Sequence, residues 1–325
     1  MQRHHAPYRA DVVGSFLRPD AIKQARLKFA SGEIDAGQLR AVEDEAIRHV
    51  VEQQCACGLH VVTDGEFRRA WWHFDFFDGL QGVERYDSQQ GIQFNGVQTK
   101  AHGVRVTGKL GFGDHPMLED FRYLKSISGN AQPKMTIPSP SVLHFRGGRK
   151  DIDATVYPDL KDYFDDLATT WRDAIRAFYD AGCRYLQLDD TVWAYLCSDD
   201  QRRQIRERGD DADELARIYA RVLNKALEAS RTISPSGCMS VAATSVQPGF
   251  PKGAMSRWLK CCSGRSTWMP FSLSTTMTGA VILRHCVLFA RASSRWCSVL
   301  SPLKMASWRT RKGEGASGGG GEIRG

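Results

Sequence analysis

Apolar residues recur along this chain with two periods, which predicts a succession of helices and strands. Between residues 21 and 58 the apolar positions have helical spacing, and the stretches 157–181 and 211–229 are the clearest later helices. Short apolar runs bounded by turn residues separate the helices and read as strands. Repeated helix–strand units of this kind predict an α/β fold built on a parallel sheet.

Four apolar runs have the length and composition of strands. A glycine at residue 182 ends the long helix just before the last of them. The runs are residues 12–16 (VVGSF), 61–66 (VVTDGE), 134–140 (KMTIPSP) and 184–190 (RYLQLDD). The alternating, glycine-studded stretch 91–113 predicts a hairpin excursion, and it lacks the pattern of a phosphate-binding loop.

Polar side chains stand where three of the expected strands end. These are Ser15, Glu66 and Asp189. In βα-repeat enzymes the carboxyl ends of the strands meet on one face, and the active site lies there. We therefore expect the three residues to converge on one polar pocket, with Glu66 rather than Asp64 facing it.

Each of these assignments has a structural alternative. Ser15 could instead cap the helix that follows Pro19. Asp189 could be a structural acid paired with Arg184 or Arg172. Placement at a strand end favours the functional reading of Asp189.

Charge is distributed unevenly along the 325 residues, whose formal net charge is +7. Residues 1–230 contain 31 Lys+Arg against 35 Asp+Glu, whereas residues 231–325 contain 13 against 2. From about residue 229 neither a helical nor a strand period continues. The last residues, RKGEGASGGGGEIRG, have the low complexity typical of disorder.

Composition also excludes several classes of protein. No apolar run approaches the roughly 20 residues that span a membrane, and the N-terminus lacks the apolar core of a signal peptide. We therefore expect a cytoplasmic protein with no membrane partner. Nine cysteines at irregular spacing do not form a disulfide framework in a chain of this length.

Four motifs in a fixed order resemble those of cobalamin-independent methionine synthase, in particular short proteins similar to its catalytic half. They are RADVVGSFLRP (9–19), VVTDGEFRR (61–69), KMTIPSPS (134–141) and YLQLDD (185–190). The resemblance covers roughly residues 8–229. It implies a (β/α)8 TIM-type barrel that transfers a methyl group to the zinc-activated thiol of homocysteine, giving methionine. The implied donor is 5-methyltetrahydrofolate or a related methyl compound.

The resemblance also implies roles for the three strand-end residues. Ser15 with its backbone would hold the carboxylate of homocysteine, and Glu66 and Asp189 would hold its ammonium. The family binds zinc through a His-x-Cys pair, a glutamate and a later cysteine, none of which we recognise in this reading frame. We therefore expect no zinc site and no activity in the chain as written.

A neighbouring reading frame would restore the missing family motifs. Residues 237–245 (GCMSVAATS) can be encoded so that a shift of one base reads LHVCRGNF. Residues 268–279 and 295–308 similarly permit DAFFLEYDNDR and VLGLITTKNGELE, in the family's order. We therefore predict a frameshift near residue 229. The predicted organisation is an incomplete barrel at 1–229, containing the hairpin excursion, and an out-of-frame, disordered tail at 230–325.

Two other functions are compatible with parts of this pattern. An enzyme similar to uroporphyrinogen decarboxylase would share the barrel but would bind a porphyrin through acids and arginines, without a metal. A non-catalytic protein could bind nucleic acid through its basic tail, with steep salt dependence. The paired acids at residues 66 and 189 favour an amino-acid ammonium, so we expect small-molecule partners and no nucleic acid.

Overall fold

The computed structural model describes residues 11–87, 93–94, 97–98, 102–232, 240–244, 271–275 and 281–288. Contacts divide the chain into the units Met1–Ala292 and Ser293–Gly325, and all described residues belong to the first. In the described part, no helix is both long enough and apolar enough to cross a membrane.

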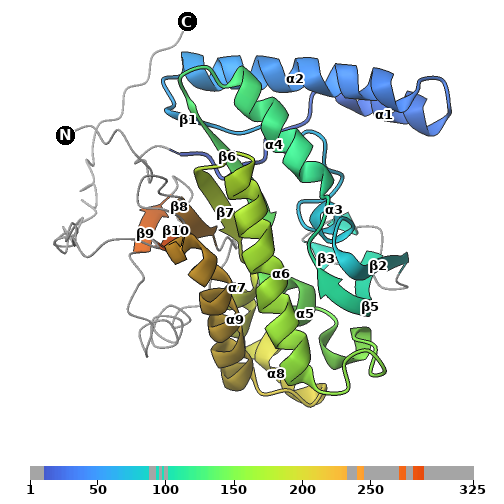
Figure 1. The fold of residues 1–325 in the computed structure, drawn as a ribbon, viewed down its shortest axis with the longest axis vertical. Helices are drawn as coiled ribbons and strands as arrows, with labels where there is room; N and C mark the ends of the chain where they lie inside the picture. Colours follow the sequence, from blue (N-terminus) through green and yellow to red (C-terminus); the bar gives the residue numbers. More distant parts are fainter. Residues whose placement is uncertain are drawn as a thin grey trace, which may run out of the picture. The chain divides into compact units, whose positions relative to one another are not determined.

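Helices and strands alternate along the described chain (Figure 1). The helices are α1 (Asp20–Ala30), α2 (Ala36–Ala56), α3 (Phe74–Phe77), α4 (Pro116–Ile127), α5 (Pro140–Phe145), the 3-10 helix η1 (Gly148–Asp151), α6 (Leu160–Asp180), α7 (Val192–Leu196), α8 (Asp199–Glu207) and α9 (Ala212–Thr232). The strands are β1 (Val61–Val62), β2 (Gln81–Asp87), β3 (Gln93–Phe94), β4 (Val97–Gln98), β5 (His102–Gly111), β6 (Gln132–Pro138), β7 (Tyr185–Asp189), β8 (Ser240–Thr244), β9 (Phe271–Thr275) and β10 (Val281–Leu288).

A six-stranded sheet with the order β1-β6-β7-β8-β10-β9 organises the fold. The pairs β1–β6, β6–β7 and β7–β8 are parallel, whereas β10 runs antiparallel to both of its neighbours. Helices connect the parallel strands, as in successive βα units. This arrangement is part of a (β/α)8 TIM-type barrel, which confirms the predicted fold class. Within the described residues the sheet remains open.

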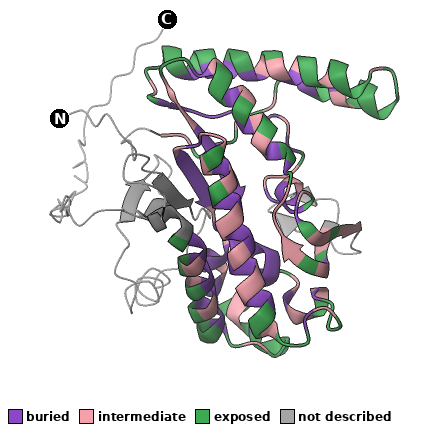
Figure 2. Cartoon of the chain, in the orientation of Figure 1, coloured by how far each residue is buried: buried purple, intermediate pink, exposed green. Residues whose placement is uncertain are grey.

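The main hydrophobic core lies between α6 and the sheet. Figure 2 shows β6 and β7 buried over most of their length, as expected for strands covered on both faces. Trp171 of α6 is fully buried, and its Nε1–H donates a hydrogen bond of 2.8 Å to the carbonyl of Pro138 at the end of β6. This bond satisfies the only polar atom of the indole side chain and fixes α6 against the strand that leads to the polar face.

The helical segment predicted between residues 21 and 58 is two helices rather than one. Gly32 adopts φ +78°, a conformation that breaks a helix and is easy only for glycine. Asp35 then begins α2 with a capping box, because its side chain accepts from the Gln38 N–H while the Gln38 side chain accepts from the Asp35 N–H. A second cluster packs these helices against β1 through Ile22, Ile47, Val51, Val62 and Phe67.

A hairpin leaves the barrel between α3 and α4. Strands β2 and β5 pair in antiparallel fashion from Gln81↔Gly111 to Asp87↔His102, and the shorter β3 and β4 pair with each other. The excursion therefore begins earlier than the glycine-rich stretch from which we predicted it. Gly82, at φ +76°, sits so close to the carbonyls of Gly108 and Lys109 that an added Cβ would lie within 2.6 Å of both oxygens.

Two further expectations differ from the described structure. Instead of a regular strand at residues 12–16, the chain makes one parallel bridge, Ser15↔Gly65, beside β1. In the segment from residue 230, where no strand pattern was visible, β8, β9 and β10 join the sheet. Residues 230–232 end α9, and the remainder of that segment lies outside the described residues. The frameshift there stays a prediction.

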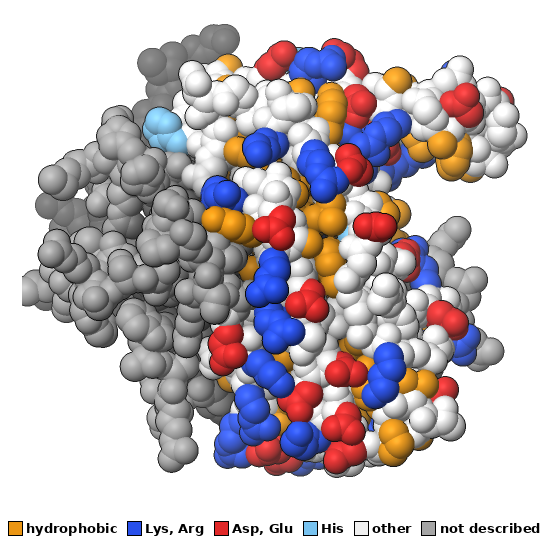
Figure 3. Space-filling model, in the orientation of Figure 1, with side chains coloured by type: hydrophobic (Ala, Val, Ile, Leu, Met, Phe, Trp, Pro, Cys, Tyr) orange, Lys and Arg blue, Asp and Glu red, His pale blue; other side chains and the backbone are white. Residues whose placement is uncertain are grey.

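Charged side chains of both signs are interspersed on the face shown in Figure 3. Local ion pairs account for several of them. Asp165 accepts hydrogen bonds of 2.9 Å from Lys161, within α6, and from Lys225, which links α6 to α9. Exposed pairs of this kind contribute little to stability.

Candidate active site at the strand ends

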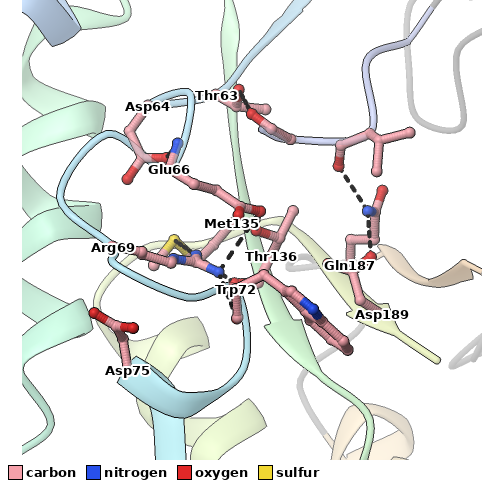
Figure 4. Close-up of polar contacts among 12 residues, drawn as sticks. Thr63, Asp64, Glu66, Arg69, Trp72, Asp75, Met135, Thr136, Gln187 and Asp189 are labelled. Atoms are coloured by element: carbon pink, nitrogen blue, oxygen red, sulfur yellow. Dashed lines mark hydrogen bonds and ion pairs between the residues drawn. The ribbon is translucent and has the colours of Figure 1, made fainter. Parts of the chain in front are cut away.

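Two carboxylates lie at the carboxyl ends of β1 and β7, the two strands that flank β6 in the sheet. Glu66 follows β1, and Asp189 is the last residue of β7 (Figure 4). The two are close enough that the charge of Glu66 acts on the ionisation of Asp189. The strand ends therefore bring these two predicted residues into one polar site.

The turn after β1 places Glu66 by an unusual backbone conformation. Gly65 and Glu66 both have positive φ, at +67° and +56°. The carboxylate of Asp64 accepts a 2.8 Å hydrogen bond from the Glu66 N–H and so supports the turn. Positive φ in a non-glycine residue is costly and is found preferentially at functional sites. Asp64 is thus buried as support for the turn that aims Glu66.

Arginines from elsewhere hold the loop that follows. Arg18 donates to the carbonyls of Glu66 and Arg69 at 3.2 and 2.6 Å. Arg26 donates to the carbonyls of Phe67 and Arg69 at 2.6 and 3.2 Å. Guanidinium groups carry five N–H donors in a fixed plane, which suits them to bind several carbonyls at once. The loop is therefore anchored through its backbone on α1 and the residues before it.

The side chain of Glu66 is buried and has two partners. Thr136 Oγ1, on β6, donates a hydrogen bond of 2.8 Å to Glu66 Oε1. Arg69 Nη1 lies 3.6 Å from the same oxygen, and both side chains are only 4% exposed. Arg69 Nη2 also donates to the carbonyl of Thr136 at 2.5 Å. Arg69 thus places a positive charge beside the buried carboxyl group of Glu66.

Asp189 is partly exposed, yet its pKa is strongly perturbed. Burial of its carboxyl group is the main cause, and the nearby Glu66 carboxylate is the second; together they raise the pKa of Asp189 to about 7. Opposing them is a hydrogen bond of 2.7 Å from Gln187 Nε2 to Asp189 Oδ1. A carboxyl group of this kind is partly protonated at neutral pH, and a cation that binds beside it favours its ionised form.

Ser15 lies beside the turn after β1 but, unlike Glu66, is exposed. Its side chain is exposed, its backbone bridges to Gly65, and the neighbouring Phe16 N–H donates to the Gly65 carbonyl at 3.0 Å. The capping alternative for Ser15 is wrong, because Pro19 is the N-cap residue of α1. A contact between Ser15 and substrate stays a prediction.

The alternative ion pairs of Asp189 do not occur in the described structure. Arg184 donates instead to the carbonyls of Tyr179 and Cys183, both at 2.9 Å. Arg172 pairs with its neighbour Asp173. The next residue, Asp190, is buried and accepts from Ser141 Oγ and the Val192 N–H, so it supports the start of α7.

Because Gly14 has no side chain, Glu66 and Thr136 have room to make their hydrogen bond. Its φ is +150°, and an added Cβ would lie 2.7 Å from Thr136 Cγ2 and 3.1 Å from Glu66 Oε1. We expect Gly14→Ala to lower the free energy of unfolding by about 1–3 kcal/mol, the usual cost of overpacking. Gly58→Ala is the matched control, because Gly58 also has positive φ but nothing within 4 Å. Denaturant unfolding would contradict the crowding if the two losses were equal.

The described residues do not fit the zinc ion that the family resemblance implies. No group of three or more His, Cys, Asp or Glu side chains is arranged to hold a metal in this part of the chain. Cys55 and Cys57 are exposed near the end of α2, whereas Cys183 and Cys197 are buried. Burial raises the pKa of the Cys183 thiol to about 12, which opposes formation of the thiolate that zinc requires.

Known proteins share this chain's sequence and fold. A family model described as the catalytic domain of cobalamin-independent synthase matches residues 9–230. The uncharacterized protein YxjG of Bacillus subtilis strain 168 is 52% identical over 228 residues, which are 70% of this chain and 60% of that protein. A methionine synthase of Sulfolobus acidocaldarius is 25% identical over 179 residues, or 55% of this chain and 50% of that protein.

A solved structure agrees with these matches. It is a Listeria monocytogenes protein named, provisionally, a vitamin-B12 independent methionine synthase. It superposes with a TM-score of 0.61 and 43% identity, covering 75% of this chain and 67% of that one. The chain spans about 60% of the length of YxjG and about half that of the Sulfolobus enzyme. Because the family model covers more than half of its residues, the chain belongs to the cobalamin-independent synthase family through the catalytic domain.

Proposed function

We propose that this protein is of the methionine synthase type of methyltransferase, that the chain as written does not complete the methyl transfer, and that its strand-end carboxylates bind the ammonium group of homocysteine. The observation that carries the proposal is the Glu66–Asp189 pair, in which one carboxylate raises the pKa of the other. The proposed methyl donor is 5-methyltetrahydrofolate or a related compound. The product would be methionine.

The electrostatics of the pair suit a cation of this size. Two nearby carboxylates in a poorly solvated site resist simultaneous ionisation, and an ammonium between them removes that repulsion. Arg69 already neutralises part of the Glu66 charge at 3.6 Å, whereas among the described residues the side chain of Asp189 accepts a hydrogen bond from the neutral amide of Gln187 alone. Binding of the ligand's ammonium group should therefore stabilise the charge of Asp189 more than that of Glu66.

The carboxylate end of the amino acid needs donors rather than acceptors. We assign this role to Ser15 and its backbone, because the residue is exposed and lies beside Gly65, one residue before Glu66. A hydroxyl and backbone N–H groups are the ordinary partners of a substrate carboxylate. This assignment extends the site from the ammonium toward the N-terminal segment.

The proposal includes no step through a metal ion, because the described residues do not fit one. We also propose that a frameshift near residue 229 accounts for the missing family motifs. The family match ends at residue 230, where the composition changes. Resequencing codons 220–240 tests this proposal. An independent read that gives the same codons and the same reading frame as the present sequence, and so no shift, would contradict a sequencing error, and the same result in the genomes of close relatives would contradict a frameshift altogether.

Binding of homocysteine should depend on pH through Asp189. The pKa of its carboxyl group in the free protein is about 7, and an ammonium ligand favours the ionised form. We therefore expect affinity to fall as pH falls through about 7, approaching tenfold per pH unit well below this value. Binding should release about half a proton at about pH 7 and nearly one proton at lower pH. Titration calorimetry in buffers of different ionisation enthalpy measures both quantities. Affinity that stays constant from about pH 5 to 8 would contradict the proposed role.

A further inference from the structure

Strand β7 sends a column of polar side chains into the interior of the barrel. Tyr185, Gln187 and Asp189 are two residues apart, so they project to the same face of the strand. All three are engaged in hydrogen bonds there. Tyr185 OH donates to Asp11 Oδ2 at 2.7 Å, and Gln187 Nε2 donates both to Asp189 and to the carbonyl of Val13, each at 2.7 Å.

The amide of Gln187 lies between the ammonium group of Lys134, which can only donate hydrogen bonds, and the carboxylate of Asp189, which when ionised can only accept them. Lys134 Nζ, on β6, donates to Gln187 Oε1 at 3.1 Å. On the other side, the Asp189 carboxylate and the Val13 carbonyl accept from Nε2. Figure 4 shows the contact between Gln187 and Asp189. An ammonium has no acceptor, so the amide has one orientation that satisfies every partner. Gln187 is itself fully buried, so bulk solvent does not reach its side chain.

Lys134 is held firmly enough to impose that orientation. Its side chain is completely buried, with Nζ 2.9 Å from Asp11 Oδ1, and it also donates to the carbonyl of Val12. Asp11 is fixed in turn by Tyr185. The N-terminal segment, β6 and β7 are thus joined by one buried network that ends at Asp189.

We propose that Gln187, oriented by Lys134, is a positioning residue that presents an N–H donor to Asp189, favours the charged form of this carboxylate and aims it at the substrate ammonium. The inference rests on the proposed function for the identity of the ligand. The network itself does not depend on that ligand. It gives the buried glutamine of the QLDD motif a role beyond packing.

Several charges act on Asp189 besides this hydrogen bond. Glu66 raises its pKa, whereas Arg69 and Lys134 lower it.

Gln187→Met keeps the approximate size of the side chain and removes only the amide. A hydrogen bond to an ionised group has a strength that corresponds to about one to two pH units, so we expect Gln187→Met to raise the pKa of Asp189 by that amount.

The direct test is the pH titration of the Asp189 carboxyl carbon by NMR in the ligand-free full chain, assigned with Asp189→Asn. The matched control is Gln54→Met. Gln54 is a buried glutamine whose amide binds only backbone groups, at Val50 and Thr63. We expect the pKa of Asp189 to rise in Gln187→Met and to stay unchanged in Gln54→Met. Unchanged values in both, or equal rises in both, would overturn the proposal.

Two further variants separate the parts of the argument. Gln187→Glu keeps the bond to Lys134 but offers Asp189 no N–H donor, so it should also raise proton affinity at the site, and it serves if Gln187→Met does not fold. Lys134→Met should raise the pKa of Asp189 more in the wild-type background than in Gln187→Met, because part of its effect passes through the amide. Strictly additive shifts would overturn the orienting role of Lys134.

A homocysteine titration of the same proteins distinguishes this inference from the proposed function. If the pKa of Asp189 shifts as expected and homocysteine affinity at about pH 7 falls about tenfold or more in Gln187→Met, both stand. If the pKa shifts but no variant or wild type binds homocysteine, the network stands and the proposed ligand is wrong. If homocysteine binds and Gln187→Met changes neither its affinity nor the pKa, the positioning role is wrong.

Discussion

Replacing Arg69 with methionine is expected to lower the free energy of unfolding by about 3–5 kcal/mol, because it leaves a buried charge without its partner. Arg69 and Glu66 are each 4% exposed, and their charged atoms are 3.6 Å apart. Arg69 also donates to the carbonyls of Thr136 and Trp72, at 2.5 and 3.3 Å. The variant would therefore lose the neutralising charge and leave one buried and one partly buried carbonyl short of a donor.

Arg172→Met is the control for this substitution. Arg172 pairs with Asp173 at 3.4 Å, but their side chains are 40% and 44% exposed, so the loss should stay below about 1 kcal/mol. Denaturant unfolding monitored by circular dichroism measures both variants. Adding Glu66→Gln to Arg69→Met should recover part of the stability, because it removes the unpaired charge. Equal losses for the two arginine variants would contradict the account of Glu66.

Asp189→Asn should weaken homocysteine binding by about ten- to hundredfold, the equivalent of a charge-assisted contact of about 1.5–3 kcal/mol. Asparagine keeps the shape of the side chain and removes the charge opposite the ammonium. Glu66→Gln should behave alike, although Arg69 then loses its counter-charge. Stability must therefore be measured beside affinity for each variant.

The double variant tests whether both carboxylates bind one ammonium. If they do, Asp189→Asn and Glu66→Gln together should lose less affinity than the sum of the single losses, because each already disrupts the shared contact. Calorimetric titration at about pH 8, where wild-type Asp189 is mostly ionised, gives the three values. Fully additive losses, or unchanged affinity in Asp189→Asn, would contradict a shared site.

The periodic parts of this fold could be predicted from sequence because local pattern determines them. The apolar face of α6 and the buried, largely apolar run of β7 each predict their element, and α9 follows the same rule. Glu66 and Asp189 could be found because acids at strand ends are a strong signal in a parallel sheet. These predictions needed only residues close together in the sequence.

Other features depend on contacts that no local pattern reveals. The role of Arg69 follows from Thr136, 67 residues away, and Gln187 acquires its meaning from Lys134, 53 residues away. The stretch around Ser15 has the pattern of a strand, but in the described structure it makes one bridge, and its Gly14 lies close against Glu66 and Thr136. A lysine and a glutamine inside apolar runs are the signal that could have pointed to the buried network.

The central claim is that this site recognises an ammonium group, and one comparison tests it most directly. Homocysteine and 4-sulfanylbutanoate differ only in the amino group, so calorimetric titration of both into the full chain at about pH 8 isolates its contribution. We predict that homocysteine binds at least about tenfold more tightly than the deamino compound, and that Asp189→Asn removes most of this difference. Equal affinity of the two compounds for the wild-type protein would contradict the claim.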